Sequence, residues 1–181
     1  MSKAAIIYHS KYGHTKQYAQ WIAEALNADI YTDKYLKNIR LEDYDTLVFG
    51  SGMYAGANKA AQLIVQYFNR IRHKKVLLFT CGALDVSNEA IAADTDRALN
   101  TVLTPEIRAK IRIFHLRGGI DFARLSWWYR LMLKFPYSKF SKIPENERNA
   151  SEKSFLSIYG KTVDFTNKAQ IEPIVKYCKS I

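Results

Sequence analysis

Cysteines are scarce in this sequence and long apolar runs are missing, and each absence excludes a class of protein. The chain has two cysteines, Cys81 and Cys178, which are far apart and in no C-x-x-C spacing. That pattern argues against a disulfide framework and a zinc site, so no metal is expected. No run reaches the ~20 apolar residues of a membrane-spanning helix. The first residues pass directly into a short strand, so we expect no signal peptide and predict a cytoplasmic protein.

The common glycine-rich nucleotide motifs are also missing. The eight glycines form neither a G-x-G-x-x-G fingerprint nor a P-loop with its lysine. A dinucleotide pyrophosphate or a triphosphate is therefore not expected as a ligand. No nucleic-acid fold motif is present, and the aromatic residues do not follow the pattern of a base-stacking sheet, so we predict no nucleic-acid partner.

The most informative feature that is present is a strand followed by a polar turn near the start of the chain. Residues 4–8 are apolar, and residues 10–15 read Ser-Lys-Tyr-Gly-His-Thr before an amphipathic helix. The first turn of a helix directs backbone N–H groups and a partial positive charge toward an anion. We therefore predict a site for a single terminal phosphate, such as that of FMN.

Apolar runs alternate with helical patterns along the whole chain. We predict strands at residues 4–8, 29–32, 47–50, 75–81 and 111–116. Helices are expected over residues 15–26, 59–72 and 88–100, with a helical turn opening at 104–106. This alternation predicts an α/β fold, a doubly wound five-stranded parallel sheet with helices on both faces. We expect a single domain over residues 1–181, with a helical insertion at 118–149.

Three loops of similar character follow three of the predicted strands. Each is small, carries glycine and is polar at its edges, and they lie at residues 10–15, 51–56 and 80–85. In a doubly wound sheet, ligands bind beyond the carboxyl ends of the strands, near the point where the strand order reverses. The three loops are therefore expected to share one site.

These loops, in this order along an α/β chain, resemble the flavodoxin family, and the resemblance covers nearly the whole chain. It implies FMN as the cofactor, with its phosphate in the first loop and its isoalloxazine ring between the other two. The residues implied for the phosphate are Ser10, Lys11, Tyr12, Gly13, His14 and Thr15. Those implied for the ring are Ser51, Gly52, Met53, Tyr54, Ala55, Gly56, Thr80, Cys81, Gly82, Ala83 and Leu84.

Several of these residues also have a purely structural interpretation. The hydroxyls of the first loop suit helix capping as well as phosphate binding, and Tyr12 departs from the family's usual Thr or Asn. His14 is either an exposed residue at the helix start or a phosphate ligand. Tyr54 either lies against the flavin or packs on the helix behind it. No basic partner is identifiable beside Cys81, so we assign no catalytic thiol and no other catalytic residue.

The positive charge is concentrated in one segment. The net charge is +10, and residues 108–142 hold nine of the 27 basic residues against a single acidic one, Asp121. We expect a helix there from Phe122 to Phe135, ended by Pro136. Its apolar stripe either packs on the sheet or, with tryptophan and arginine exposed, lies at an anionic membrane surface that residues 122–142 would contact. The predicted stripe consists of Leu125, Trp128, Leu131, Met132 and Phe135.

Residues 118–136, with Gly-Gly followed by a Trp/Tyr-Arg-Leu-Met-x-Lys helix, and residues 162–175 resemble the menaquinone-dependent protoporphyrinogen IX dehydrogenases, a flavodoxin-like branch. Residues 142–149 lack that branch's Gly-Gly-x-Thr-Asp-type run. The resemblance implies an FMN-dependent oxidoreductase of heme biosynthesis that passes electrons from a reduced organic substrate to a quinone. Such an enzyme would be peripheral at the inner face of the membrane. Two alternatives stay open: a soluble flavodoxin-type electron carrier, and a non-enzymatic module that binds a membrane or a partner.

Overall fold

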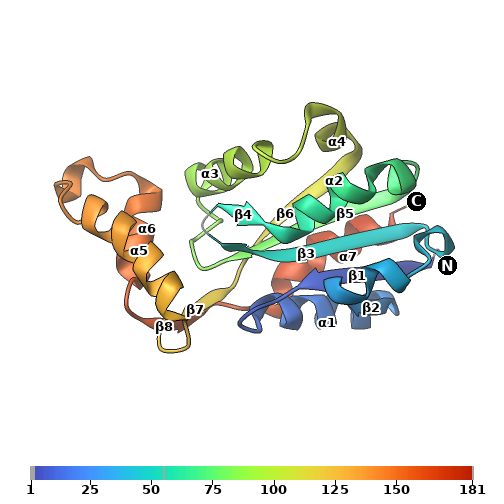
Figure 1. Cartoon of the computed structure of the whole chain (residues 1–181), viewed down its shortest axis with the longest axis horizontal. Coiled ribbons are helices and arrows are strands. Elements are labelled where there is room, and N and C mark those ends of the chain that lie inside the picture. Colours follow the sequence, from blue (N-terminus) through green and yellow to red (C-terminus); the bar gives the residue numbers. More distant parts are fainter. Residues whose placement is uncertain (1–2, 55, 181) are drawn as a thin grey trace.

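The computed structural model describes residues 3–54 and 56–180, and its centre is a parallel sheet with the strand order β2-β1-β3-β5-β6 (Figure 1). All five predicted strands form, and all neighbouring pairs along this path are parallel. The order reverses between β1 and β3, which is where ligands bind in doubly wound sheets. The strands are β1 (Ala4–His9), β2 (Asp29–Thr32), β3 (Thr46–Tyr54), β5 (Lys75–Gly82) and β6 (Ile111–Arg117).

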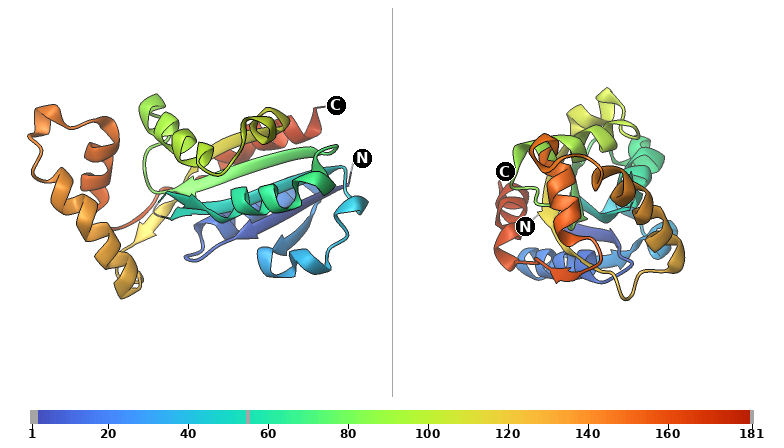
Figure 2. Two further views of the ribbon diagram at one scale, coloured as in Figure 1. Left: turned by 45° about the horizontal axis from the view of Figure 1, so that its top comes forward. Right: turned by 90° about the vertical axis from the view of Figure 1, so that its left-hand side faces the viewer.

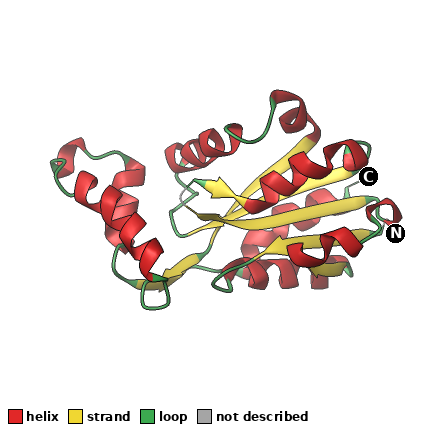
Figure 3. Cartoon of the chain, viewed as in Figure 1, coloured by secondary structure: helices red, strands yellow, loops and turns green. Residues whose placement is uncertain are grey.

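Helices cover both faces of this sheet, as predicted (Figure 3). One face carries α1 (His14–Leu26) and α7 (Glu172–Lys179). The other carries α2 (Lys59–Ile71), α3 (Glu89–Asn100) and α4 (Pro105–Lys110). Short 3₁₀ helices complete this part of the chain: η1 (Asp33–Asn38), η2 (Leu41–Asp43) and η4 (Lys168–Ile171). The chain therefore forms three layers, helix on sheet on helix.

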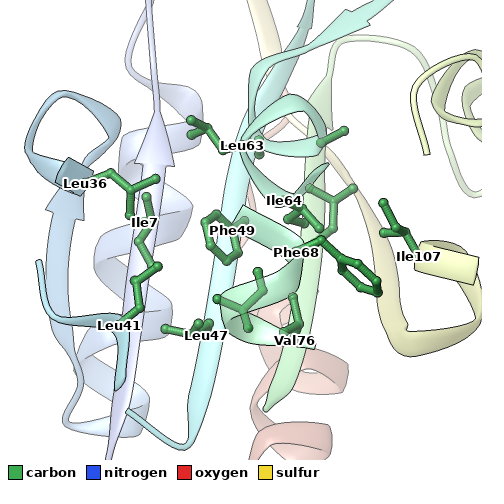
Figure 4. Close-up of a cluster of buried hydrophobic side chains, with 14 of the residues drawn as sticks. Ile7, Leu36, Leu41, Leu47, Phe49, Leu63, Ile64, Phe68, Val76 and Ile107 are labelled. Atoms are coloured by element: carbon green, nitrogen blue, oxygen red, sulfur yellow. The ribbon is translucent and has the colours of Figure 1, made fainter. Parts of the chain in front are cut away.

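Two hydrophobic cores hold the layers together because successive strand residues point to opposite faces. Ile6 packs in the core under α1, whereas its neighbour Ile7 packs in the core under α2. Phe49 and Ile64 lie at the centre of the second core and are fully buried (Figure 4). Cys178 on α7 is buried in the first core.

The second loop is shorter than predicted because β3 continues past Gly50 to Tyr54. A two-residue strand, β4 (Ala57–Asn58), pairs antiparallel with the end of β3. Most of the predicted loop is therefore the tip of a hairpin, and the Asn58 side chain caps α2 by accepting a hydrogen bond from the Ala61 N–H. Ala55, one of the predicted cofactor residues, lies outside the described residues.

After β6 the chain leaves the sheet and forms a separate lobe beyond the carboxyl ends of the strands (Figure 2). A two-stranded antiparallel ribbon connects the lobe to the sheet. The lobe consists of β7 (Gly119–Asp121), α5 (Trp127–Phe140), η3 (Glu145–Glu147), α6 (Ala150–Ile158) and β8 (Thr162–Asp164). This excursion corresponds to the predicted insertion and extends to Asp164.

The predicted bounds of the basic aromatic helix are wrong at both ends. The Asp121 carboxylate accepts hydrogen bonds from the N–H groups of Ala123 and Arg124, which holds a turn and delays the helix until Trp127. Pro136 lies inside α5 and leaves one carbonyl of the preceding turn without its usual donor. In the described part of the chain, no helix is both long enough and apolar enough to cross a bilayer.

Candidate functional site

The three predicted loops meet at one cavity of about 120 Å³ at the carboxyl ends of β1, β3 and β5. This is the place that the reversal in strand order predicts. The predicted residues that line the cavity are Ser10, Tyr12, His14, Thr15, Gly52, Met53, Tyr54, Cys81, Gly82 and Ala83. Residues up to 73 positions apart are thus brought into one site by the sheet.

The other predicted residues lie beside the cavity rather than in its wall. Lys11 and Gly13 line a neighbouring groove on the other side of the first loop. Ser51 is fully buried, and its hydroxyl donates to the Gly52 carbonyl and accepts from the Lys59 N–H. Thr80 is also buried, with its hydroxyl oxygen 2.8 Å from His115 Nδ1. Gly56 and Leu84 do not line the cavity.

The first loop leaves the start of α1 open. Gly13 precedes the helix with φ +107°, a conformation that favours glycine, and an added Cβ there would have no atom within 4 Å. The Ser10 hydroxyl accepts the Gly13 N–H at 3.2 Å, so it shapes the loop instead of capping the helix. No side chain caps α1, and its first turn has no acidic residue. Its first N–H groups, which lack intrahelical acceptors, are therefore available to an anion.

The other long helices of the sheet layers differ from α1 in this respect. Asn58 caps α2 and Asn88 caps α3, in each case by accepting a hydrogen bond from a first-turn N–H. Because these caps satisfy the donors that an anion would need, only α1 of these three combines a glycine turn with an uncapped start at the cavity.

His14 faces the cavity, so its interpretation as an exposed residue is wrong. Its side chain is 17% exposed, and Nε2 lies 3.8 Å from Asp164 Oδ1 on β8. The ring also lies against Gly119, where an added Cβ would come within 2.7 Å of Nε2. His14 therefore connects the first loop to the β7–β8 ribbon.

Tyr54 closes the cavity from the hairpin side. Its hydroxyl accepts the Lys11 N–H at 3.2 Å, and its ring covers Gly52 so closely that an added Cβ would lie 2.7 Å from ring atoms. Tyr12 and Tyr129 contact it edge-on, with ring centroids 6.3 and 6.1 Å away. Burial raises the pKa of Tyr54 to about 12. Tyr54 thus contacts the first loop and α5.

Cys81 lies in the wall of the cavity, and its thiol is in the protonated, unreactive form. The side chain is 5% exposed, and burial raises the pKa of its thiol to about 12. The thiol is therefore protonated at neutral pH, which agrees with the expectation of no catalytic thiol. In residues 3–54 and 56–180, no group of three or more His, Cys, Asp or Glu side chains could hold a metal ion.

The lobe contributes five cavity residues that the sequence did not predict. Three of them come from α5 and the turn before it, at a spacing of four residues, which places them on one helix face. That spacing was readable in the sequence, but the predicted stripe includes only Leu125 of these three residues. The five residues are Gly119, Ile120, Leu125, Tyr129 and Leu133.

The rest of the predicted stripe points to solvent. Among the described residues of α5 none is buried, and Trp127 and Trp128 stack on each other with centroids 4.5 Å apart. The prediction that this stripe packs on the sheet is therefore wrong, apart from Leu125. The exposed side chains, between 47% and 78% accessible, are Trp127, Trp128, Leu131, Met132 and Phe135.

Comparison with known proteins gives a family and several distant structures. The sequence profile of the flavodoxin domain matches residues 5–146. An uncharacterized protein of Methanocaldococcus jannaschii is 40% identical over 82 residues, which are 43% of this chain and 53% of that protein. The chain thus spans about half the length of this curated relative.

Two solved structures illustrate the structural likeness. A flavoprotein in complex with FMN from Lactobacillus acidophilus NCFM has 16% identity and a TM-score of 0.45, over 65% of this chain and 93% of that chain. Oxidised flavodoxin 2 from Bacillus cereus has 19% identity and a TM-score of 0.41, over 78% of this chain and 100% of that chain.

Proposed function

This chain belongs to the flavodoxin domain family, and on that premise we propose that it binds FMN at the three-loop cavity and acts as an oxidoreductase. The observation that carries the proposal is the uncapped start of α1 at the meeting point of the three loops. When bound, FMN supplies the transfer of one or two electrons. The chain supplies binding, orientation and protection from water.

The first loop fits the phosphate end of FMN. Backbone N–H groups of the first turn of α1 and the open backbone at Gly13 offer donors without a competing carboxylate. A helix N-terminus stabilises an anion by about 0.3–1 kcal/mol, and each hydrogen bond to a charged group contributes roughly 1.5–3 kcal/mol. Several such donors together account for tight phosphate binding without an ion pair.

The ring end fits only if Tyr54 moves. The cavity of about 120 Å³ is smaller than the roughly 300–1,000 Å³ of typical small-molecule pockets. Outward rotation of Tyr54 breaks one hydrogen bond, from the Lys11 N–H, and uncovers Gly52. We therefore assign Tyr54 as the residue that turns aside and packs against the flat ring, with the cavity side of α5 as the opposite wall.

For the reaction, we propose that a reduced organic substrate of the protoporphyrinogen IX type donates electrons and that a quinone accepts them. The support is the resemblance of the 118–142 segment, together with the position of α5. One side of α5 lines the cavity through Tyr129 and Leu133, and another side exposes large apolar residues. An apolar acceptor would reach the site along such a helix.

The exposed side of α5 also supports a peripheral position at an anionic, cytoplasmic membrane face. Trp128 and Phe135 are 58% and 78% exposed, and Arg130 and Lys134 flank a shallow groove on the same helix. Interfacial helices combine Trp, Phe and Leu with basic residues in this way. Each basic residue near an anionic surface contributes about 1 kcal/mol.

The visible absorption spectrum and FMN titration of the purified protein test the cofactor proposal. Bound FMN with quinone-coupled oxidation of protoporphyrinogen IX supports the full proposal. Bound FMN without turnover reduces it to the soluble electron carrier. A colourless protein with no affinity for FMN contradicts it and favours a non-enzymatic binding module.

Vesicle pelleting tests the membrane position separately. We expect binding to vesicles of phosphatidylcholine with phosphatidylglycerol, and loss of binding when Trp128 and Phe135 are both changed to serine. Val65→Ser is the matched control, since Val65 is an exposed apolar residue on α2, away from the lobe. Equal pelleting of all three proteins would exclude α5 as the contact surface.

A further inference from the structure

A second hollow adjoins the cavity on the other side of the first loop. It is a groove of about 600 Å³ between the carboxyl ends of β1 and β2, which is within the size range of small-molecule sites. Ser10 and Tyr12 line both the groove and the cavity, so a single loop separates them. A molecule that extends over this loop would contact both the groove and the cavity.

The groove is strongly basic. Its wall includes Lys11, Lys16, Lys34 and Arg124, which come from the first loop, α1, the start of η1 and the turn before α5. Asp33 is the one carboxylate in the same wall, and its Oδ2 is hydrogen-bonded to His9 Nδ1 at 3.0 Å. Four basic side chains from four separate elements therefore share this groove with one carboxylate.

These four cations lack acidic partners within residues 3–54 and 56–180. Lys11 is held by aromatic rings, with Nζ 3.8 Å from the centre of the Tyr129 ring. Some exposed basic residues elsewhere do have acidic partners, as Arg70 has Glu42 at 2.8 Å and Lys168 has Glu24 at 3.1 Å. The groove thus has an excess of positive charge that an anion would balance.

Tyrosine side chains make the groove suitable for an organic anion. Tyr8, Tyr12 and Tyr35 line it together with the cations, and Tyr35 is 60% exposed at its edge. Aromatic faces pack against flat unsaturated groups, whereas an inorganic ion needs only the charges. The Tyr12 hydroxyl is buried with no hydrogen-bond partner among the described residues, so this wall also has an unused polar group.

We propose that this groove binds the carboxylate groups of an organic dianion whose flat aromatic rings extend over the first loop toward the cavity. The substrate role of that dianion rests on the proposed function, whereas the binding itself does not. Lys34 and Arg124 contact the carboxylates from opposite walls, and Lys11 and Lys16 supply the field that attracts them. The FMN phosphate is assigned to the backbone N–H groups at the start of α1 and the carboxylates to the Lys34 and Arg124 side chains, so the two ligands use different groups of the protein.

Binding of protoporphyrin IX to the full-length protein, followed by fluorescence anisotropy, tests the proposal. Removal of two cations in Lys34→Gln/Arg124→Gln should weaken binding roughly tenfold or more, since charge-assisted hydrogen bonds are lost. Lys110→Gln/Arg112→Gln is the matched control, because it removes the same charge from exposed residues at the far end of the sheet. The control should bind like the unchanged protein.

Two further binding measurements test which chemical groups of the ligand the groove recognises. Protoporphyrin IX dimethyl ester keeps the flat body without the charges and should bind at least tenfold more weakly. Inorganic phosphate should compete no better than chloride at equal ionic strength. Equal affinity of the two double variants, equal affinity of the ester, or strong competition by phosphate would each overturn the proposal.

FMN uptake is measured by visible absorbance in every variant. This measurement distinguishes a failure of the groove proposal from a failure of the proposed function. Loss of porphyrin binding with FMN uptake unchanged supports the groove. A protein that takes up no FMN but binds porphyrin through Lys34 and Arg124 would contradict the proposed function and still support the groove.

Discussion

Replacement of Tyr54 by phenylalanine should make FMN bind more tightly. The hydroxyl of Tyr54 accepts the Lys11 N–H at 3.2 Å, and this bond must break before the ring can turn away from Gly52. A hydrogen bond of this kind stabilises the closed arrangement by about 0.5–1.5 kcal/mol. Without it, opening becomes easier by the same amount, and the FMN dissociation constant should fall roughly 2- to 12-fold.

The alanine variant separates the effect of the ring from that of the hydroxyl. Tyr54→Ala removes the hydroxyl and also the ring that packs against the flavin, worth about 0.5–1.5 kcal/mol beyond its buried area. FMN should therefore bind more weakly to Tyr54→Ala than to Tyr54→Phe. Quenching of FMN fluorescence on titration measures both constants. Tyr67→Phe, on α2 and not in the cavity wall, is the control for loss of a tyrosine hydroxyl and should leave affinity unchanged.

The unliganded protein provides an independent check on the same bond. Loss of 1 kcal/mol lowers the melting temperature of a protein of this size by roughly 2–4 °C, so Tyr54→Phe should melt slightly lower without FMN. If Tyr54→Phe binds FMN as weakly as Tyr54→Ala, the hydroxyl holds the cofactor rather than closing the cavity, and the reasoning is refuted.

Three other changes test the loop, the sheet and the thiol. Gly13→Ala should weaken FMN binding and lower the free energy of unfolding by about 1–2 kcal/mol, because a residue with a side chain is strained at a φ of +107° even though there is space for the Cβ. FMN titration measures the first effect and urea unfolding the second. Gly50→Ala should lower the free energy of unfolding by roughly 1–3 kcal/mol or more, since the new Cβ would lie 2.0 Å from the buried Phe79 ring. Gly82→Ala is the control, because its Cβ would have no atom within 4 Å, and it should change the melting temperature little. Burial raises the pKa of the Cys81 thiol to about 12. The protonated thiol therefore contributes fully to the stability of the fold below the ordinary thiol pKa, and this contribution is lost as the pH rises toward 12. Urea unfolding at pH 8 and pH 11 should show this loss, with a smaller loss in Cys81→Ala.

The sheet was predictable because its strands are buried on both faces. Runs such as residues 75–81 are apolar without alternation, and this pattern is typical of a central parallel strand. The ribbon of β7 and β8 was not predictable in the same way. Its strands have three residues each and lie 40 positions apart, and Ile120 pairs with Val163 only because the lobe folds back. Non-local pairing of this kind leaves no periodic signal in the sequence.

The cofactor site was predictable to the level of its loops, but not to the level of its walls. Glycine and hydroxyl residues after β1 mark the turn at Ser10 and Gly13, since backbone geometry requires them there. Orientation of the longer side chains depends on tertiary contacts instead. His14 turns inward because Gly119 and Asp164 lie beside it, and these residues come from a ribbon that the sequence did not indicate.

The residues of α5 show why the predicted apolar stripe of this helix is exposed instead of packed on the sheet. A helix that carries large apolar residues on more than one side does not show by its pattern which of these sides is covered. Tyr129 and Leu133 line the cavity, whereas Trp128 and Met132, one position earlier in each case, are about half exposed. Large apolar residues therefore lie on both sides of the helix, toward the cavity and on the outer surface of the lobe. A fully polar outer side would have made the inner side readable from the sequence, and the exposed Trp128 and Met132 prevent this.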